Sequence, residues 1–444
     1  MLNTLNDVLN NVDNFIWGMP LIILILFTGI LLTVRLRGLQ VRHLGKALHY
    51  VFHNEDDGEG EVTSFGALCT ALSATIGTGN IVGCATAIVA GGPGALFWMW
   101  LAAFFGMATK YAEGMLAVKY RVIAEDGHAL GGPFYYIEKG MGKNFKWLAK
   151  LFCIFGTMVG LFGIGTFTQV NGITSAVNNF FDSSNVHTIS LFGMNYSISV
   201  VVAGIIVTVC VGLVIIGGIK RISKVSEIIV PFMAVTYIGV CLLIVLTHLP
   251  QVPVAFGQII QSAFGLKAAA GGAIGAMTVA MQKGIARGIF SNEAGLGSAP
   301  IAAAAAQTNE PVRQGLVSMT GTFIDTIIVC TMTGLAIVMT GAWDMGLEGV
   351  AVTTKAFALG LPFPAKVSAF ILMMCLVFFA FTTILGWAYY SERCLEYLVN
   401  GKKFVITVFK WLYILAVFIG PFMTVSAVWT IADICNGLMA FPNL

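Results

Sequence analysis

Charged residues are scarce in this chain of 444 residues, with 10% Asp, Glu, Lys and Arg together. A soluble domain carries about 25%. Hydrophobic residues make up 57% of the chain, and mean hydropathy is +0.87. Several runs reach the ~20 apolar residues that cross a bilayer. The composition excludes a soluble globular protein and predicts an all-α polytopic membrane protein. The formal charge of +3 lies in short loops and forms no basic face, so no nucleic-acid partner is expected.

The motifs of several function classes are missing. None of the nine cysteines falls in a CxxC pair, and most lie in apolar stretches, so no disulfide framework is expected. The chain has no HExxH and no GxSxG, which argues against a membrane enzyme. The glycine-rich stretch around Glu293 lacks the strand and the lysine of a phosphate-binding loop, and we expect it to be a cytoplasmic loop. A channel usually shows repeated filter loops, and here paired broken helices favour a closed central site instead.

The apolar runs predict ten spans and a short apolar stub from about residue 435. These spans are 16–34, 64–90, 95–118, 148–177, 197–217, 225–248, 269–288, 314–340, 366–390 and 405–432. If the chain alternates from an external N-terminus, every Lys and Arg except Lys267, Lys355 and Lys366 falls on one side, which the positive-inside rule makes cytoplasmic. Lys283 and Arg287 are counted on that side.

The second span, 64–90, is interrupted by Gly77-Thr78-Gly79-Asn80, which is too rich in glycine to hold a helix. Backbone that unwinds at membrane depth is tolerated where it is buried in protein or lines a cavity. The free N–H groups of Thr78, Gly79 and Asn80 and the positive end of the restarting helix suit a carboxylate. The free carbonyls near Ser73, Ala74 and Ile76 suit Na⁺ or an ammonium group. The alternative is that the glycines only permit close helix packing.

The seventh span is also irregular, and it reads GGAIGAMTVAMQKGIARG. Interrupted segments in corresponding positions of two halves indicate an inverted-repeat transporter with its site at the breaks. The first repeat would cover 64–248 and the second 269–444, and the two would start in opposite directions across the membrane.

Polar side chains at membrane depth are the remaining candidates. Buried amides are costly unless they are paired. Gln169 is suited to hydrogen-bond a substrate, and Asn171 is equally suited to bond to a neighbouring helix. The adjacent Thr382 and Thr383 are suited to a cage of oxygen ligands for Na⁺, or to bonding with their own helix. Asp325 is a functional candidate as an acid inside the membrane, or the partner of Lys283 or Arg287.

The chain resembles the alanine or glycine:cation symporter family, also called the sodium:alanine symporters. The segment GGPGALFWMWLAAFFG at 91–106 is specific to that family. ATIGTGNIVG, GIARGIFSNEAGLGSAP, FFAFTTILGW and the terminal ADICNGLMAFPNL are also similar to its blocks, so the resemblance covers nearly the whole chain.

The resemblance implies one transporter domain over 1–444 with a LeuT-type fold, in which an extra helix at 16–34 precedes a 5+5 inverted repeat. Family members usually continue past PNL, so the last helix is expected to be truncated. The implied function is sodium-coupled import of alanine or glycine across the plasma membrane. A proton-coupled amino-acid transporter is the alternative, and a channel is less favoured.

The resemblance also implies the roles of individual residues. The substrate carboxylate would bind Thr78 and Gly79, beside Asn80. Gln169 and an unwound region near Met277 and Thr278 would close the pocket. The Na⁺ ligands would be the carbonyls of Ser73, Ile76 and Phe379 and the hydroxyls of Thr382 and Thr383, with Asp325 secondary.

Overall fold

Helices form nearly all the regular structure of this computed structural model, which describes residues 2–53, 58–124, 127–191, 194–265, 272–423 and 426–444. Lys267 and the first residues of the second predicted repeat, 269–271, lie outside the described residues. The helices of the first half are α1 (Leu2–Ile16), α2 (Met19–Arg35), α3 (Leu39–Arg42), α4 (Leu44–Phe52), α5 (Ser64–Thr75), α6 (Cys84–Gly91), α7 (Ala95–Lys119), α8 (Pro133–Tyr136), α9 (Lys146–Phe162), α10 (Phe167–Phe181), α11 (Ile198–Ile215), α12 (Gly218–Thr247) and α13 (Val252–Ala263).

The second half is also helical. Its helices are α14 (Ala273–Asn292), α15 (Ala299–Ala303), α16 (Pro311–Thr322), α17 (Thr331–Thr340), α18 (Val350–Gly360), α19 (Ala365–Leu398), α20 (Lys403–Ile419) and α21 (Ser426–Asn443). Wider, π-helical turns occur at η1 (Gly79–Gly83), η2 (Ile137–Met141) and η5 (Phe323–Cys330), and tighter 3₁₀ turns at η3 (Lys143–Phe145), η4 (Leu249–Gln251), η6 (Ala342–Asp344) and η7 (Gly420–Phe422).

Seven helical segments of the described chain are long and apolar enough to cross a membrane, and the bent pair α5–α6 makes up an eighth. Many large apolar side chains on these helices, such as Val235 on α12 and Leu213 on α11, face outward. Outward-facing apolar surface on long helices is what a bilayer requires, because lipid rather than water covers it. The structure therefore confirms a helical, polytopic membrane protein.

Several span boundaries differ from the sequence prediction. The predicted span 148–177 is two helices, α9 and α10, because the chain leaves the helix at Gly163 and re-enters it at Phe167. The predicted span 405–432 is divided between α20 and α21. Two shorter helices, α13 and α18, were not predicted because 12 and 11 residues are too few to span a bilayer.

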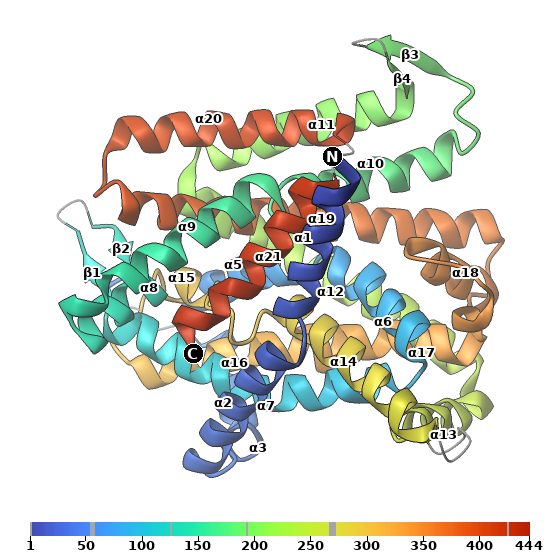
Figure 1. Cartoon of the computed structure of the whole chain (residues 1–444), viewed down its shortest axis with the longest axis horizontal. Coiled ribbons are helices and arrows are strands. Elements are labelled where there is room, and N and C mark those ends of the chain that lie inside the picture. Colours follow the sequence, from blue (N-terminus) through green and yellow to red (C-terminus); the bar gives the residue numbers. More distant parts are fainter. Residues whose placement is uncertain (1, 54–57, 125–126, 192–193, 266–271, 424–425) are drawn as a thin grey trace.

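The described strands form two small antiparallel hairpins outside the helical bundle. β1 (Val122–Ile123) pairs with β2 (Ala129–Leu130), and β3 (Thr188–Leu191) pairs with β4 (Met194–Ser197). The second hairpin occupies the connector between α10 and α11. Figure 1 shows it projecting from one end of the molecule. The hairpins leave the helical character of the fold unchanged.

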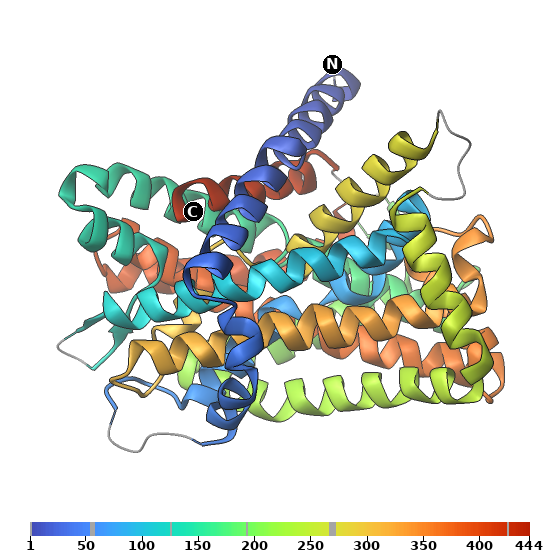
Figure 2. The ribbon, with the colours of Figure 1, turned by 90° about the horizontal axis from the view of Figure 1, so that it is seen from below.

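The broken helix α5–α6 is surrounded by other helices. α5 packs against α12, α16 and α19, and α6 packs against α14 and α17. The N-terminal helix α1 packs instead against α21 at the edge of the bundle, and Figure 2 shows its start projecting beyond the other helices. The break thus lies in the interior, and α1 lies on the outside of the helices that enclose it.

Candidate functional site

The predicted interruption is present between α5 and α6. The regular helix α5 ends at Thr75, η1 begins at Gly79, and the two helical pieces are bent by 52°. Ile76 leaves the helix with φ −77° and ψ 93°. The Gly77 N–H donates to Asn80 Oδ1 over 2.9 Å, so a side chain replaces the main-chain partner that unwinding removes. Asn80 therefore stabilises the unwound turn.

Asp325 lies directly beside this turn. Its carboxylate accepts hydrogen bonds from Asn80 Nδ2 at 2.7 Å, from Ser291 Oγ at 3.0 Å and from Thr326 Oγ1 at 2.7 Å. All four side chains are buried. Three donors on one buried carboxylate offset much of the cost of removing it from water. The acid thus joins η5 to both the broken helix and α14.

The alternative partners of Asp325 lie elsewhere. Within the described part of the chain, Asp325 forms no ion pair with Lys283 or Arg287. These two basic residues lie inside α14 and line a cavity that also contains Asp13 of α1. The assignment of Lys283 and Arg287 to the cytoplasmic side stays a prediction, but the structure places both residues inside α14 and not in a loop. They share the cavity with the N-terminal helix.

The two threonines of α19 meet the end of α5. Thr382 Oγ1 and Thr383 Oγ1 each donate to the Phe379 carbonyl over 3.0 Å, and Thr383 Oγ1 lies 3.4 Å from the Ile76 carbonyl. A methyl group on Gly77 would lie 2.5 Å from Thr383 Oγ1. The hydroxyl therefore occupies the space that this glycine leaves, and several oxygen atoms without formal charge gather at the break.

Ser73 lies on α5, one turn before the break, and is buried. Its hydroxyl donates to the Thr70 carbonyl over 2.7 Å, a bond within its own helix. Its side chain is thus satisfied locally, as a buried hydroxyl requires.

Gln169 of α10 also reaches the break. Its Oε1 lies 3.5 Å from the Thr78 nitrogen, at the long limit of a hydrogen bond. Asn171 points elsewhere, and its Nδ2 donates to the Gly420 carbonyl over 3.0 Å. The structure thus separates the two amides. Asn171 joins α10 to the segment after α20, and Gln169 faces the unwound turn.

The expected unwinding of the seventh span at Met277 and Thr278 is wrong. α14 is a continuous helix of 20 residues, and Thr278 Oγ1 bonds to its own helix at Ile274. The residues that face the break are Phe290 and Ser291. A Cβ built on Gly79 would lie 3.6 Å from Ser291 Cα and 3.7 Å from Phe290 Cδ1. At 1.5 Å per residue, Met277 lies ~20 Å farther along the helix, too far to close a pocket at Gly79.

A second interruption follows the end of α14. Glu293 takes a left-handed conformation with φ 55°, and the chain then passes through Gly295 and Gly297 with φ 90° and 78° before α15 begins. Glu293 lies in the connector between α14 and α15, in agreement with the expected loop, but its side chain is buried. It accepts hydrogen bonds from Trp387 Nε1 and from Ser298 Oγ.

A second buried acid holds the same interruption from the other side. Glu113 Oε1 of α7 accepts the N–H groups of Gly295 and Gly297 at 3.1 and 3.2 Å, and Asn443 Nδ2 at 2.7 Å. A carboxylate satisfies the backbone donors that unwinding frees. The two interruptions are therefore both stabilised by side chains from neighbouring helices.

Sequence reasoning missed Ser291, Thr326 and Phe290. Ser291 and Thr326 are ordinary helix hydroxyls in isolation, and Phe290 is one of many apolar residues. The available signal was the glycine-rich SNEAGLGS run, which marks where a helix must end. The residues just before such an end are candidates to face an opposing break.

Residues 2–444 match the family model described as the sodium:alanine symporter family. The chain belongs to that family. It is 57% identical over 443 residues to an uncharacterized transporter of Haemophilus influenzae, with 99% of this chain and 92% of the relative covered. It is 45% identical over 446 residues to the sodium/alanine symporter AgcS of Methanococcus maripaludis, with 99% and 93% covered. It is 39% identical over 443 residues to the uncharacterized transporter YflA of Bacillus subtilis, with 98% and 89% covered.

Membership in the sodium:alanine symporter family makes the chain a membrane transporter and not an enzyme. In this family member, both helix interruptions lie in segments where polar groups of several helices converge. The first brings Asn80, Asp325, Gln169 and Thr383 together. The second is held by Glu113 and Glu293.

The packing of α19 on α5 in this symporter leads to a prediction. A Cβ on Gly386 would lie 2.7 Å from both the Ala74 nitrogen and Cβ, and 2.8 Å from Ala74 Cα. Gly386→Ala therefore has to push α19, which carries Thr383, away from α5. Overpacking of this kind costs about 1–3 kcal/mol. We expect a lower midpoint in thermal unfolding followed by tryptophan fluorescence in detergent.

Gly239→Ala on α12 is the matched control, because a Cβ there meets no atom within 4 Å. Ala also has the better helix propensity, so this variant should unfold at or above the wild-type midpoint. Equal midpoints for Gly386→Ala and wild type would show that the two helices are not in tight contact.

Proposed function

We propose that this chain imports small neutral amino acids, chiefly alanine and glycine, together with Na⁺ across the plasma membrane by alternating access. The observation that carries this proposal is the meeting of the Thr383 hydroxyl with the Ile76 carbonyl at the break. An unwound helix end and uncharged oxygens at one point are the features by which transporters bind a coupling ion.

The proposed Na⁺ site uses the carbonyls of Ser73, Ile76 and Phe379 with the hydroxyls of Thr382 and Thr383. The side chains of all five residues are buried. Na⁺ is a hard cation that needs oxygen ligands in place of its water, and five oxygens supply them without a formal charge. The 3.4 Å separation between Thr383 Oγ1 and the Ile76 carbonyl is long for a hydrogen bond, so little is lost when an ion takes its place.

The proposed substrate site is the unwound turn itself. The N–H groups of Thr78 and Gly79 would bind the substrate carboxylate, which would replace the long contact between Thr78 and Gln169. Asn80 would act by holding the turn open, because its side chain is bound to Gly77 and Asp325. Phe290 and Ser291 take the place that we had expected for Met277 and Thr278.

The LeuT-type 5+5 repeat is supported by the packing of counterparts. The broken segments α5–α6 and α14–α15 would open the two repeats, and α6 packs against α14. The second, third and fourth spans of each repeat also pack against each other, as α7 with α16, α9 with α19, and α11 with α20. A two-fold axis in the membrane plane relates counterparts in this way. α1 and α2 precede both repeats, as an extra N-terminal segment would.

The external N-terminus and cytoplasmic basic loops remain part of the proposal. Arg121 supports them, because its guanidinium binds the carbonyls of Ala304 and Thr308 and so joins the connector after α7 to the one that leads into α16, which carries Arg313. Lys283 and Arg287 are not among these loops, since they lie inside α14 and line the cavity beside α1.

Asp325 favours a second candidate, a proton-coupled transporter. The buried acid touches Asn80 of the break, and an acid inside the membrane is a common proton carrier. Its three hydrogen bonds to Asn80, Ser291 and Thr326 fit a structural role as well. The Na⁺-coupled and the proton-coupled proposals differ in which substitution should change the ion dependence of uptake, that of Thr382 and Thr383 or that of Asp325.

The test of the proposed function is uptake of labelled alanine by the purified chain in proteoliposomes. We expect accumulation with an inward Na⁺ gradient, and only equilibration or no uptake without it. Accumulation driven by an inward proton gradient in the absence of Na⁺ would replace the proposal with the proton-coupled alternative. Uptake that fails to saturate with alanine would indicate a channel.

The size of the proposed site leads to a substrate prediction. Phe290 and Ser291 lie close to Gly79, so little space remains for a side chain. Unlabelled glycine, alanine and serine should each reduce alanine uptake by more than about half when present in tenfold excess. Leucine and glutamate should leave it near the uninhibited rate. Competition by leucine equal to that by alanine would show that the substrate class is wrong.

A further inference from the structure

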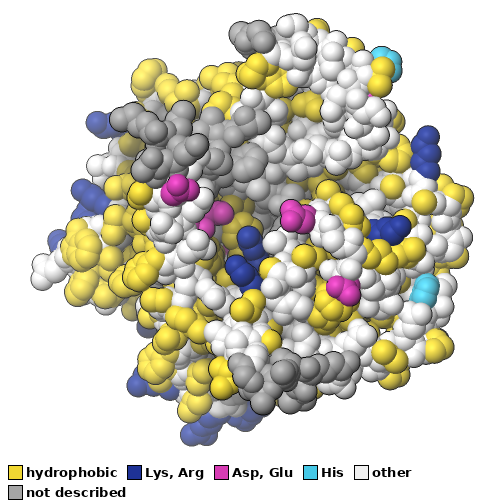
Figure 3. Space-filling view, turned by 45° about the vertical axis from the view of Figure 1, so that its right-hand side comes forward, with side chains coloured by type: hydrophobic (Ala, Val, Ile, Leu, Met, Phe, Trp, Pro, Cys, Tyr) yellow, Lys and Arg dark blue, Asp and Glu magenta, His cyan; other side chains and the backbone are white. Residues whose placement is uncertain are grey.

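A cavity of about 100 Å³ lies between α1, α14 and α21, apart from the broken helix. Its lining includes charged side chains from all three helices, together with Phe290 of α14 and Trp17, which follows α1. On one face of the molecule, basic side chains lie in a hollow with acidic side chains around it (Figure 3). A water molecule needs only ~10–15 Å³, so the cavity has room for a small solute.

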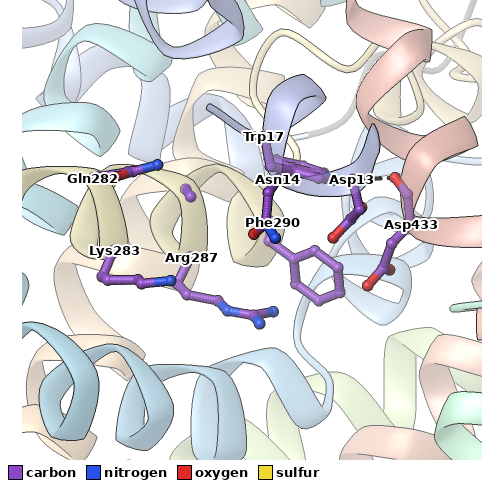
Figure 4. Close-up of a pocket in the computed structure, with 9 residues that line it drawn as sticks. Asp13, Asn14, Trp17, Gln282, Lys283, Arg287, Phe290 and Asp433 are labelled. Atoms are coloured by element: carbon purple, nitrogen blue, oxygen red, sulfur yellow. Dashed lines mark hydrogen bonds between the residues drawn. The ribbon is translucent and has the colours of Figure 1, made fainter. Parts of the chain in front are cut away.

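The charges of this cavity are arranged on separate walls. Figure 4 shows Lys283 and Arg287 extending from α14 on one side and Asp13 and Asp433 on the other, with the Phe290 ring between them. Within the described residues, no ion pair joins either acid to either base. Asp13 Oδ1 is a buried atom without a hydrogen-bond partner. Opposite charges held apart in a partly buried place leave both incompletely satisfied.

We propose that this cavity is a second binding site, for a zwitterionic amino acid on its way to the break. The guanidinium of Arg287 would bind the carboxylate, and Asp13 and Asp433 would bind the ammonium group. Trp17 and Phe290 would contact the small side chain. An amino acid carries both charges and can pair with the basic side chains on one wall and with the acidic side chains on the other, whereas an inorganic ion can pair with one wall. This proposal rests on the proposed function, since it takes the same substrate class.

Phe290 connects the cavity to the broken helix. Its ring lies 6.1 Å from that of Trp17 and 5.4 Å from the Arg287 guanidinium carbon. Its Cδ1 would also lie 3.7 Å from a Cβ on Gly79. The second site and the unwound turn are therefore on two sides of one aromatic ring. A rotation of that ring would pass an amino acid from Arg287 to the N–H groups of the break.

The N-terminal segment of α1 and Trp17 forms part of the proposed second site. Trp17 Nε1 donates to the Asp433 carbonyl over 3.0 Å and so fixes the end of α1 against α21. Asp13 and Trp17 both lie in that segment, which is outside the two proposed repeats. α1 and Trp17, which follows it, thus supply one wall of the second site.

The test measures binding and transport by the full chain. In lipid nanodiscs with saturating Na⁺, we expect labelled alanine to bind at two molecules per chain in wild type and at one in Arg287→Gln. In proteoliposomes, Arg287→Gln should raise the KM for alanine about tenfold and keep the maximal rate within about twofold. Arg287→Lys should recover part of the affinity, because it retains the charge but not the planar fork.

Two further variants keep the result interpretable. Lys366→Gln removes a basic side chain that lines a different cavity, and it should bind two alanines. Asp433→Asn removes the opposite wall, and it decides the question if Arg287→Gln does not elute as a folded protein in size-exclusion chromatography.

Each outcome has one meaning. The second site alone is overturned if wild type binds one alanine and still transports it, and if Arg287→Gln and Asp433→Asn leave the KM for alanine unchanged. The second site is also overturned if Arg287→Gln and Asp433→Asn still bind two alanines but lower the maximal rate of uptake, because these residues would then control a conformational step and not bind the substrate. Wild type that neither binds nor transports alanine would instead overturn the proposed function.

Discussion

Replacement of both Thr382 and Thr383 by valine is expected to raise the Na⁺ concentration for half-maximal alanine uptake at least about tenfold. Valine keeps the shape of threonine but removes the hydroxyl, so two of the five proposed oxygen ligands are lost. A tenfold change corresponds to about 1.4 kcal/mol, a modest figure for two buried ligands. Alanine affinity at saturating Na⁺ should change less, because the proposed site of the substrate carboxylate is at Thr78 and Gly79, away from the two hydroxyls. The measurement is uptake titrated with Na⁺ in proteoliposomes.

Two variants accompany the double replacement. Thr208→Val on α11 removes a hydroxyl that also bonds to a carbonyl of its own helix, at Gly204 over 2.7 Å, and it should leave the Na⁺ requirement unchanged. Asp325→Asn tests the alternative, since it keeps the shape of the acid and removes its charge. An unchanged Na⁺ titration in the double variant, together with lost ion dependence in Asp325→Asn, would move the ion site to Asp325.

Replacement of Gly79 by leucine is expected to weaken alanine binding by two orders of magnitude or to abolish uptake. A Cβ at this position is already in ordinary contact with Ser291 Cα at 3.6 Å and Phe290 Cδ1 at 3.7 Å. The remaining atoms of leucine would have to occupy the space proposed for the substrate carboxylate. The loss should appear as a raised KM in uptake and as weak equilibrium binding of labelled alanine.

Two controls separate this effect from misfolding. Gly79→Ala adds only the Cβ that fits, and it should transport alanine with a KM within about threefold of wild type. Gly83→Leu places the same side chain in the same turn where no atom lies within 4 Å, and it should remain active. Normal alanine affinity in a monodisperse Gly79→Leu variant would show that the carboxylate binds elsewhere.

The first interruption could be predicted from the sequence because its causes are local. Gly77 and Gly79 within an apolar run are costly in a helix wherever the run packs. The adjacent Thr382 and Thr383 could also be identified as candidate oxygen ligands from the sequence, because they are neighbours in one apolar run. Their distance to Ile76 does not, because it depends on how α19 settles on α5 through contacts such as Gly386 against Ala74.

The irregular seventh span shows the limit of local reasoning. Its glycines between 272 and 288 indicated unwinding near Met277, but the helix runs on to Asn292 and breaks at Glu293–Gly297 instead. A glycine permits unwinding without requiring it. The break occurs where buried partners, Glu113 and Trp387, satisfy the groups that unwinding exposes.

The sequence by itself determined that the chain is a helical membrane protein and where the first helix breaks. Composition, run length and glycine content act within one segment, so they can be assessed without a fold. Only the tertiary structure decided that Asp325 meets Asn80, that Ser291 rather than Met277 faces Gly79, and that Arg287 lies opposite Asp433. The depth at which two helices align depends on the packing of side chains far apart in the chain, and no pattern within either helix specifies it.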